Sequence, residues 1–164
     1  LAGSSAASDV YKRQIYNIGY RIMRKEVFEL FDDFSKLTKR ADKIKFLQQV
    51  GDEYPAFKDV LRGTFDPTLK FVLPEGNPPY TPNRPESVPN SLQRLHRQFG
   101  DFVEGARSQD LGQLRVETRF IQLLESIHAE DALIVLSMKD KKSPVKGLTK
   151  KLVQEAFPKM IASS

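Results

Sequence analysis

Apolar side chains recur at steps of three and four residues along most of the chain between Arg24 and Phe157. This is the spacing of side chains along one face of an α-helix. The pattern predicts seven helices and contains no convincing strand with alternating polarity. It also shows no internal repeat at the periods typical of solenoid proteins. We therefore expect an all-α fold.

The first three predicted helices lie between Arg24 and Phe65. The first exposes one apolar face, made of Val27, Phe28, Leu30, Phe31, Phe34 and Leu37. Thr38 is the expected N-cap of the second helix and Gly51 should lie just past its end. Its expected buried face consists of Ala41, Ile44, Phe46, Leu47 and Val50. Pro55 suits the first turn of the third helix, whose apolar residues are Phe57, Val60, Leu61 and Phe65.

A proline-rich segment interrupts the helical pattern between Asp66 and Pro89. It holds most of the chain's ten prolines, and proline removes backbone donors and forces its predecessor into extended geometry. We expect a short extended piece, 69–73, followed by a long loop at 74–89. Two interpretations stay open: a functional or mobile loop, or a strap that covers the helices with Phe71, Leu73 and Tyr80.

Helical spacing resumes after this loop. Ser91 is the expected N-cap of a fourth helix that closes at Gly105, and a fifth should run from about Gln109 to Ile127. A sixth, Ala129 to Lys139, carries acidic residues in its first turn, where the helix dipole favours negative charge. Thr149 should cap a short last helix that runs through Phe157 and is stopped by Pro158.

The first 22 residues differ from the rest. Residues 1–14, LAGSSAASDVYKRQ, have no helical or strand periodicity and resemble a translated sequencing-adaptor remnant of the kind found in metagenomic assemblies. We expect residues 1–22 to be a non-native or disordered leader and Met23 to be the natural start, although residues 15–22 could be a native extension. Residues 23–162 then form a single helical domain.

The residue inventory argues against catalysis. The chain has no cysteine, two histidines and no glycine-rich phosphate loop or nucleophile motif, so we expect no enzyme activity, no cofactor and no metal site. We interpret His96 and His128 as ordinary surface or capping histidines. No apolar run approaches the roughly 18 residues that a membrane span needs, so we expect no membrane partner.

Positive charge is concentrated in one segment. Residues 139–151, KDKKSPVKGLTKK, carry a net charge of +5, equal to that of the whole chain, while residues 23–138 are mildly acidic. The segment should be a loop that opens into the helix capped by Thr149, where free backbone N–H groups and lysines could hold phosphate. A solvated, lysine-rich hinge is the alternative.

The same segment carries a family resemblance. The stretch Gly147 to Ile161 resembles the end of the N-terminal DNA-binding domain of ATP-dependent DNA ligases, notably those of tailed phages. Residues 41–47, 57–61 and 64–67 are similar to that domain's K-I-x-x-L, following helix and Y-D-P turn. The whole chain also resembles a family of small tailed-phage proteins of unknown function. The resemblance implies a ligase N-terminal-domain-like helical fold.

The chain departs from the ligase pattern in three places. The catalytic domain is missing, so the resemblance implies a stand-alone, non-catalytic relative. The loop from Asp140 to Gly147 is longer and contains Pro144. The R-x-x-T-G-N site survives only loosely, as Arg107 and then Gly112-Gln113.

The resemblance implies a duplex-DNA-binding domain without sequence preference, acting beside phage replication or repair enzymes in the cytoplasm of the infected bacterium. Gly147 and Thr149 would contact phosphates, and Lys146, Lys150 and Lys151 would supply charge. Arg107 and Gln113 are second-rank candidates. Electrostatics alone adds three more lysines: Lys139, Lys141 and Lys142.

Two other functions remain open. The first is a protein-interaction module whose surface is the proline-rich loop with Phe71, Tyr80 and Arg84, and whose partner is a phage replication protein such as a sliding clamp. The second is a protein that binds a small anionic nucleotide at the lysine segment, although a loop alone seldom forms the concave pocket that such a ligand needs.

Overall fold

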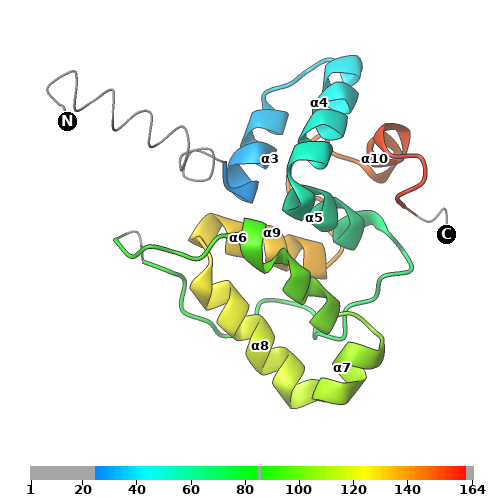
Figure 1. Ribbon diagram of the computed structural model, residues 1–164. Helices are drawn as coiled ribbons and strands as arrows, with labels where there is room; N and C mark the ends of the chain where they lie inside the picture. The colour runs from blue at the N-terminus through cyan, green and yellow to red at the C-terminus, as the bar shows by residue number, and fades with distance from the viewer. Residues whose placement is uncertain (1–24, 85, 162–164) are drawn as a thin grey trace, which may run out of the picture.

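The regular structure of the described residues is entirely helical (Figure 1), which confirms the all-α prediction. The computed structural model describes residues 25–84 and 86–161. The expectations for residues 1–22 and for a start at Met23 lie outside these ranges. The elements in chain order are α3 (Val27–Ser35), α4 (Arg40–Glu53), α5 (Pro55–Phe65), α6 (Leu92–Leu95), the 3-10 helix η1 (His96–Asp101), α7 (Ala106–Leu111), α8 (Gln113–Ser126), α9 (Ala129–Lys139) and α10 (Lys150–Ala156).

Helix α9 is the centre of the molecule. It packs against α3, α5 and α8, and Figure 1 shows it between α3–α5 on one side and α6–α8 on the other. Its residues Ala132, Val135 and Met138 are fully buried. A helix that is apolar on most of its circumference belongs inside a core, which explains why α9 runs through the interior while α10 lies outside, against α4.

Aromatic side chains fill the core on both sides of α9. The ring centroids of Phe31 and Phe57 lie 4.6 Å apart and join α3 to α5. Phe102 and Phe120 meet edge to face at 5.2 Å and join the end of η1 to α8. Edge-to-face and tilted arrangements of this kind add to the stabilisation that burial of the rings already gives.

Three predicted helix starts are confirmed by their caps. The Ser91 hydroxyl accepts the Gln93 N–H, and the Thr149 hydroxyl accepts the Leu152 N–H. His128 Nδ1 accepts the Glu130 N–H at 3.0 Å, so this histidine is a capping residue. Each side chain satisfies one of the backbone donors that the first helical turn leaves free.

The predicted ends of the second helix are wrong. Lys39 rather than Thr38 precedes α4 and offers no side-chain cap, and the helix continues past Gly51 to Glu53. Gly51 is buried inside the helix because the Phe157 ring occupies the space of its missing side chain. An ideal Cβ at position 51 would lie 2.6 Å from Phe157 Cζ. Ala41, expected on the buried face, is exposed.

This close approach gives a first prediction. The substitution Gly51→Leu should destabilise the protein by about 1–3 kcal/mol, because a side chain at this position displaces the Phe157 ring that lies between α4 and the end of α10. Urea unfolding measures the effect, and Gln49→Leu on the exposed face of the same helix is the control. The double variant Gly51→Leu with Phe157→Ala should recover part of the loss. Equal stability of Gly51→Leu and wild type would show that the ring does not hold this place.

Two further helix predictions need correction. The helix expected from Ser91 to Gly105 ends at Leu95 and continues as η1 to Asp101. The helix expected over Gln109 to Ile127 is two helices, separated at Gly112, whose φ of +81° lies in the left-handed region that favours glycine. Periodicity did not reveal either break, because apolar side chains continue at helical steps across both.

The proline-rich segment packs as a strap. Phe71, Leu73 and Tyr80 are half-buried against the core. The Val72 N–H donates to the Phe102 carbonyl and the Glu104 N–H to the Lys70 carbonyl, each at 2.8 Å. These two bonds pair the segment with the residues after η1 and support the strap interpretation over that of a free loop.

One carboxyl group is buried where α3 begins. Asp131 on α9 has no exposed surface, and its Oδ1 accepts the Phe28 N–H at 2.8 Å. Its Oδ2 has no hydrogen-bond partner in the described chain. Burial raises the pKa of Asp131 to about 7, the Phe28 N–H opposes this rise, and the neighbouring carboxylates of Glu26 and Glu29 add to it. Near neutral pH this group therefore exchanges a proton.

Candidate nucleic-acid interface

The lysine-rich segment is anchored on both sides. After α9 the chain turns at Lys141, which has a positive φ of 58°. The Ser143 hydroxyl lies 2.8 Å from the Val145 carbonyl and 2.7 Å from the Leu148 carbonyl, and Leu148 is buried. Thr149 then starts α10. The segment is therefore a folded loop that presents a defined set of side chains.

Two of its lysines bond within the protein, Lys139 from a buried position and Lys141 from an exposed one. Lys139 is buried, and its ammonium donates to the Pro74 carbonyl at 2.9 Å and pairs with Asp140. The Lys141 ammonium donates to the carbonyls of Gly63 at 2.7 Å and Asp66 at 2.9 Å. Burial lowers the pKa of Lys141. These partners correct the expectation that Lys139 and Lys141 face a phosphate: they fasten the loop to the strap and to α5.

The other candidates in the loop are accessible. Lys142, Lys146, Gly147, Thr149 and Lys151 are exposed, and Lys150 is half-buried. The ammonium groups of Lys142, Lys146 and Lys150 have no hydrogen bond or ion pair to other described residues. Lys151 lies close enough to Glu155 to contribute to the lowered pKa of that carboxyl, whose main cause is the hydrogen bond from Arg40.

Sequence reasoning did not identify Lys43 as a site residue. Its ammonium lies 5.8 Å from the centroid of the Phe34 ring, and an ideal Cβ at Gly147 would be 3.0 Å from this nitrogen. Gly147 itself has φ +87°. Helix α4 therefore adds a cation to the lysine loop. No local pattern could have revealed the contact, because its two residues come from opposite ends of the domain.

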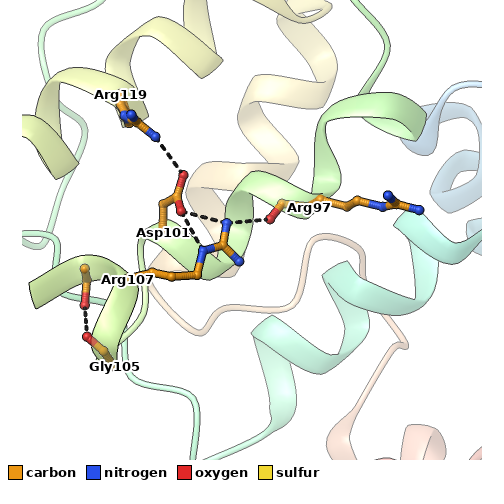
Figure 2. Close-up of polar contacts among 6 residues, drawn as sticks. Arg97, Asp101, Gly105, Arg107 and Arg119 are labelled. Carbon is orange, nitrogen blue, oxygen red and sulfur yellow. Dashed lines mark hydrogen bonds and ion pairs between the residues drawn. The ribbon is translucent and has the colours of Figure 1, made fainter. Parts of the chain in front are cut away.

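Arg107 is held by Asp101, the last residue of η1. Its Nε donates to Asp101 Oδ1 at 2.9 Å and its Nη2 to the Arg97 carbonyl at 3.3 Å, while Arg119 contacts the second oxygen of Asp101 at 3.3 Å (Figure 2). Asp101 is buried, so the two guanidinium groups compensate a charge that would otherwise be costly to bury.

Gln113 also has partners within the protein. Its Nε2 donates to the Val72 carbonyl at 2.8 Å and to Glu117 at 2.9 Å. Figure 1 shows α7 and the start of α8 at the end of the molecule away from α10. The side chains of Arg107 and Gln113 are therefore both engaged by partners within the protein.

Two residues of the expected protein-interaction surface, Phe71 and Tyr80, are half-buried because the strap packs them against the core. Phe71 lies under the Lys141 ammonium, 5.3 Å from ring centroid to nitrogen, and burial raises the pKa of Tyr80. Arg84 is exposed. Between residues 73–79 and α8 lies an open, mostly apolar cavity of about 440 Å³, with Leu114 on its wall.

The described residues contain neither a candidate metal site nor a candidate membrane span. Within residues 25–84 and 86–161, no three histidine, aspartate or glutamate side chains are grouped so that they could hold a metal ion. Across the same ranges, no helix is both long enough and apolar enough to cross a bilayer.

The fold and these contacts define a small all-α domain with a folded, lysine-rich loop docked against its N-terminal helices. The chain belongs to the family described as Family of unknown function (DUF6433), whose model matches residues 30–144. This match runs from α3 into the lysine loop. No curated protein and no solved structure matches the chain.

Proposed function

We propose that this protein is a non-catalytic domain that binds duplex DNA without sequence preference, beside the replication or repair enzymes of a tailed phage. The observation that carries the proposal is the meeting of the Lys43 ammonium with Gly147. It adds a cation from α4 to a loop whose Lys142 and Lys146 are exposed and unpaired in the described chain.

This arrangement suits the DNA backbone. Phosphate contacts supply nearly all of the affinity of nonspecific binding, and they come from lysine side chains and from free backbone N–H groups. The Gly147 N–H has no acceptor among the described residues. A phosphate oxygen bound beside Gly147 could accept from this N–H and from the nearby Lys43 ammonium, the two kinds of donor that contact phosphates in DNA complexes.

The resemblance to the ligase DNA-binding domain supports duplex DNA as the polyanion. That domain contacts duplex across the minor groove, chiefly through phosphates. Its resemblance to this chain is most continuous over Gly147 to Ile161, which here includes the Thr149 cap and α10. On this proposal the fold is a stand-alone, ligase N-terminal-domain-like helical unit.

The test is a binding titration at several salt concentrations. If four to five phosphates are neutralised, the log–log slope of affinity against salt should be about −4, at roughly −0.9 per phosphate. Two duplexes of unrelated sequence should bind equally, with and without a nick. Absence of binding, or binding that does not change with salt, would contradict the proposal.

A further inference from the structure

A second cationic cluster surrounds a cavity of about 210 Å³ between α5 and η1. Four polar side chains line it: Asp59 and Arg62 from α5, and His96 and Arg97 from η1. The rings of Phe71 and Phe99 form part of its apolar wall. None of these residues belongs to the exposed part of the lysine loop, so the cavity needs its own explanation.

His96 is positioned by Asp59. Its Nδ1 lies 2.5 Å from Asp59 Oδ2, and its side chain is only 12% exposed although it lines the cavity. A carboxylate partner of this kind keeps the proton on Nδ1 and fixes the orientation of the ring. Nε2, on the other side of the ring, has no hydrogen-bond partner in the described chain. A nearly buried imidazole thus has one nitrogen available to a ligand.

The two arginines give the cavity a positive excess. Arg62 makes a long ion pair with Asp59, with 3.6 Å between Nη1 and Oδ1. The Arg97 guanidinium has no ion pair with any described residue, and Figure 2 shows its side chain pointing away from Asp101 and Arg119. The single carboxylate in the wall, Asp59, is shared between His96 and Arg62. A guanidinium without a partner is a strong donor for a phosphate group.

Residues outside the cavity hold its walls in place. The Lys141 ammonium binds the Gly63 carbonyl and lies over Phe71, and both of these residues line the cavity. A further cation therefore lies behind the wall that Gly63 and Phe71 form, beside the carboxylate of Asp66. On the opposite wall Gly100 leaves room for the Arg107 guanidinium, which an added Cβ would strike. Arg107 and Lys141 thus contact residues of the cavity wall and do not line the cavity themselves.

We propose that this cavity binds a phosphate monoester, carried either by a free nucleotide or by the end of a nucleic-acid strand. The cavity is smaller than the roughly 300–1,000 Å³ typical of drug-sized ligands, so it suits a phosphate with little more than its sugar. Arg97 and Arg62 would contact phosphate oxygens, and a hydroxyl or amino group of the attached nucleoside would donate to His96 Nε2. The inference does not depend on DNA binding by the lysine loop.

Calorimetric titration tests this site with two pairs of probes. Deoxyadenosine 5′-monophosphate is compared with deoxyadenosine, and a duplex with 5′-phosphate ends is compared with the same duplex with 5′-hydroxyl ends. We expect saturable binding that requires the phosphate. Preference for the phosphorylated duplex, with no response to the nucleotide, assigns the ligand to a strand end, and binding of the nucleotide assigns it to a free monoester.

Variants place the binding in the cavity. Arg97→Ala should weaken phosphate-dependent binding about tenfold, the loss of one hydrogen-bonded charge. His96→Asn, which loses a neutral hydrogen bond, should weaken it by less. Arg94→Ala, an exposed cation of α6 that does not line the cavity, is the matched control. Because Arg97 is exposed, its substitution leaves the fold intact. Unchanged affinity in Arg97→Ala, or no phosphate-dependent binding by either probe pair, would overturn the proposal.

Discussion

Replacing Asp131 with asparagine is expected to stabilise the protein at pH 8 by about 2–4 kcal/mol, at roughly 1.4 kcal/mol per unit of pKa shift. Burial raises the pKa of Asp131 from 3.8 to about 7, so at pH 8 the folded protein contains an ionised carboxylate in an apolar environment. Asparagine keeps the oxygen that accepts the Phe28 N–H and removes the charge.

The pH dependence follows from the direction of this shift. Between about pH 4 and pH 7 the folded protein binds a proton at Asp131 that the unfolded chain does not, so the free energy of unfolding falls as pH rises. Above pH 7 both states are ionised and this contribution levels off. Glu26 and Glu29 on the α3 side add negative charge, and Ser91 donates to Glu26. The raised pKa is thus a property of the whole α3–α9 contact.

Urea unfolding at pH 5 and pH 8 measures the effect. Wild type should lose stability between the two, Asp131→Asn should lose much less, and the two proteins should differ little at pH 5. Asp110→Asn, on the exposed surface of α7, is the control for the loss of a negative charge. A variant that is less stable than wild type at pH 8 would show that the carboxylate is stabilised by a partner.

The second large effect is expected at the lysine loop. The triple variant Lys142→Glu, Lys146→Glu and Lys151→Glu should bind duplex DNA at least about 100-fold more weakly at physiological ionic strength, and its salt slope should be smaller by about 3, one for each lost phosphate contact. All three side chains are exposed, so circular dichroism and the unfolding midpoint should stay near those of wild type.

A matched reversal elsewhere separates a local effect from one of net charge. Lys70→Glu, Arg94→Glu and Arg115→Glu change the net charge by the same amount at exposed positions outside the loop. Affinity should fall far less in this variant. If both triple variants lose affinity equally, binding reflects overall charge. If the loop variant retains its affinity, the interface lies elsewhere. Phosphate-dependent nucleotide binding should persist in the loop variant, which keeps the two proposals distinguishable.

The sequence predicts helices better than it predicts their ends. Amphipathic spacing and capping side chains at Ser91 and Thr149 are local properties, and both caps are present. Gly51 lies inside α4, where the Phe157 ring fills the space beside it. Helix α6 ends at Leu95, and the chain continues as η1 to Asp101, which pairs with Arg107 and Arg119. Contacts between distant segments decide these boundaries, and a single sequence does not show which segments meet.

The same limit applies to the candidate site. Charge counting located the lysine loop, but it treated all six lysines alike. Lys139, Lys141 and Lys142 are close in sequence, yet only the Lys142 ammonium has no partner among the described residues. The turn at Lys141 directs the other two ammonium groups to carbonyls of the strap and of the end of α5. Lys43 and the His96–Asp59 pair were missed for the converse reason: their partners are distant in sequence.

The contacts that close this fold have a consequence for how it is made. The hydrogen bonds that join α3 to α9 and α4 to α10 connect residues 103 to 115 positions apart. Translation delivers α3 to α5 first, and their apolar faces must wait for α9 before they can be covered. For a helical protein, such distant pairings also slow folding. Until the last third of the domain has been synthesised, the apolar faces of the N-terminal helices that pack on α9 therefore stay uncovered.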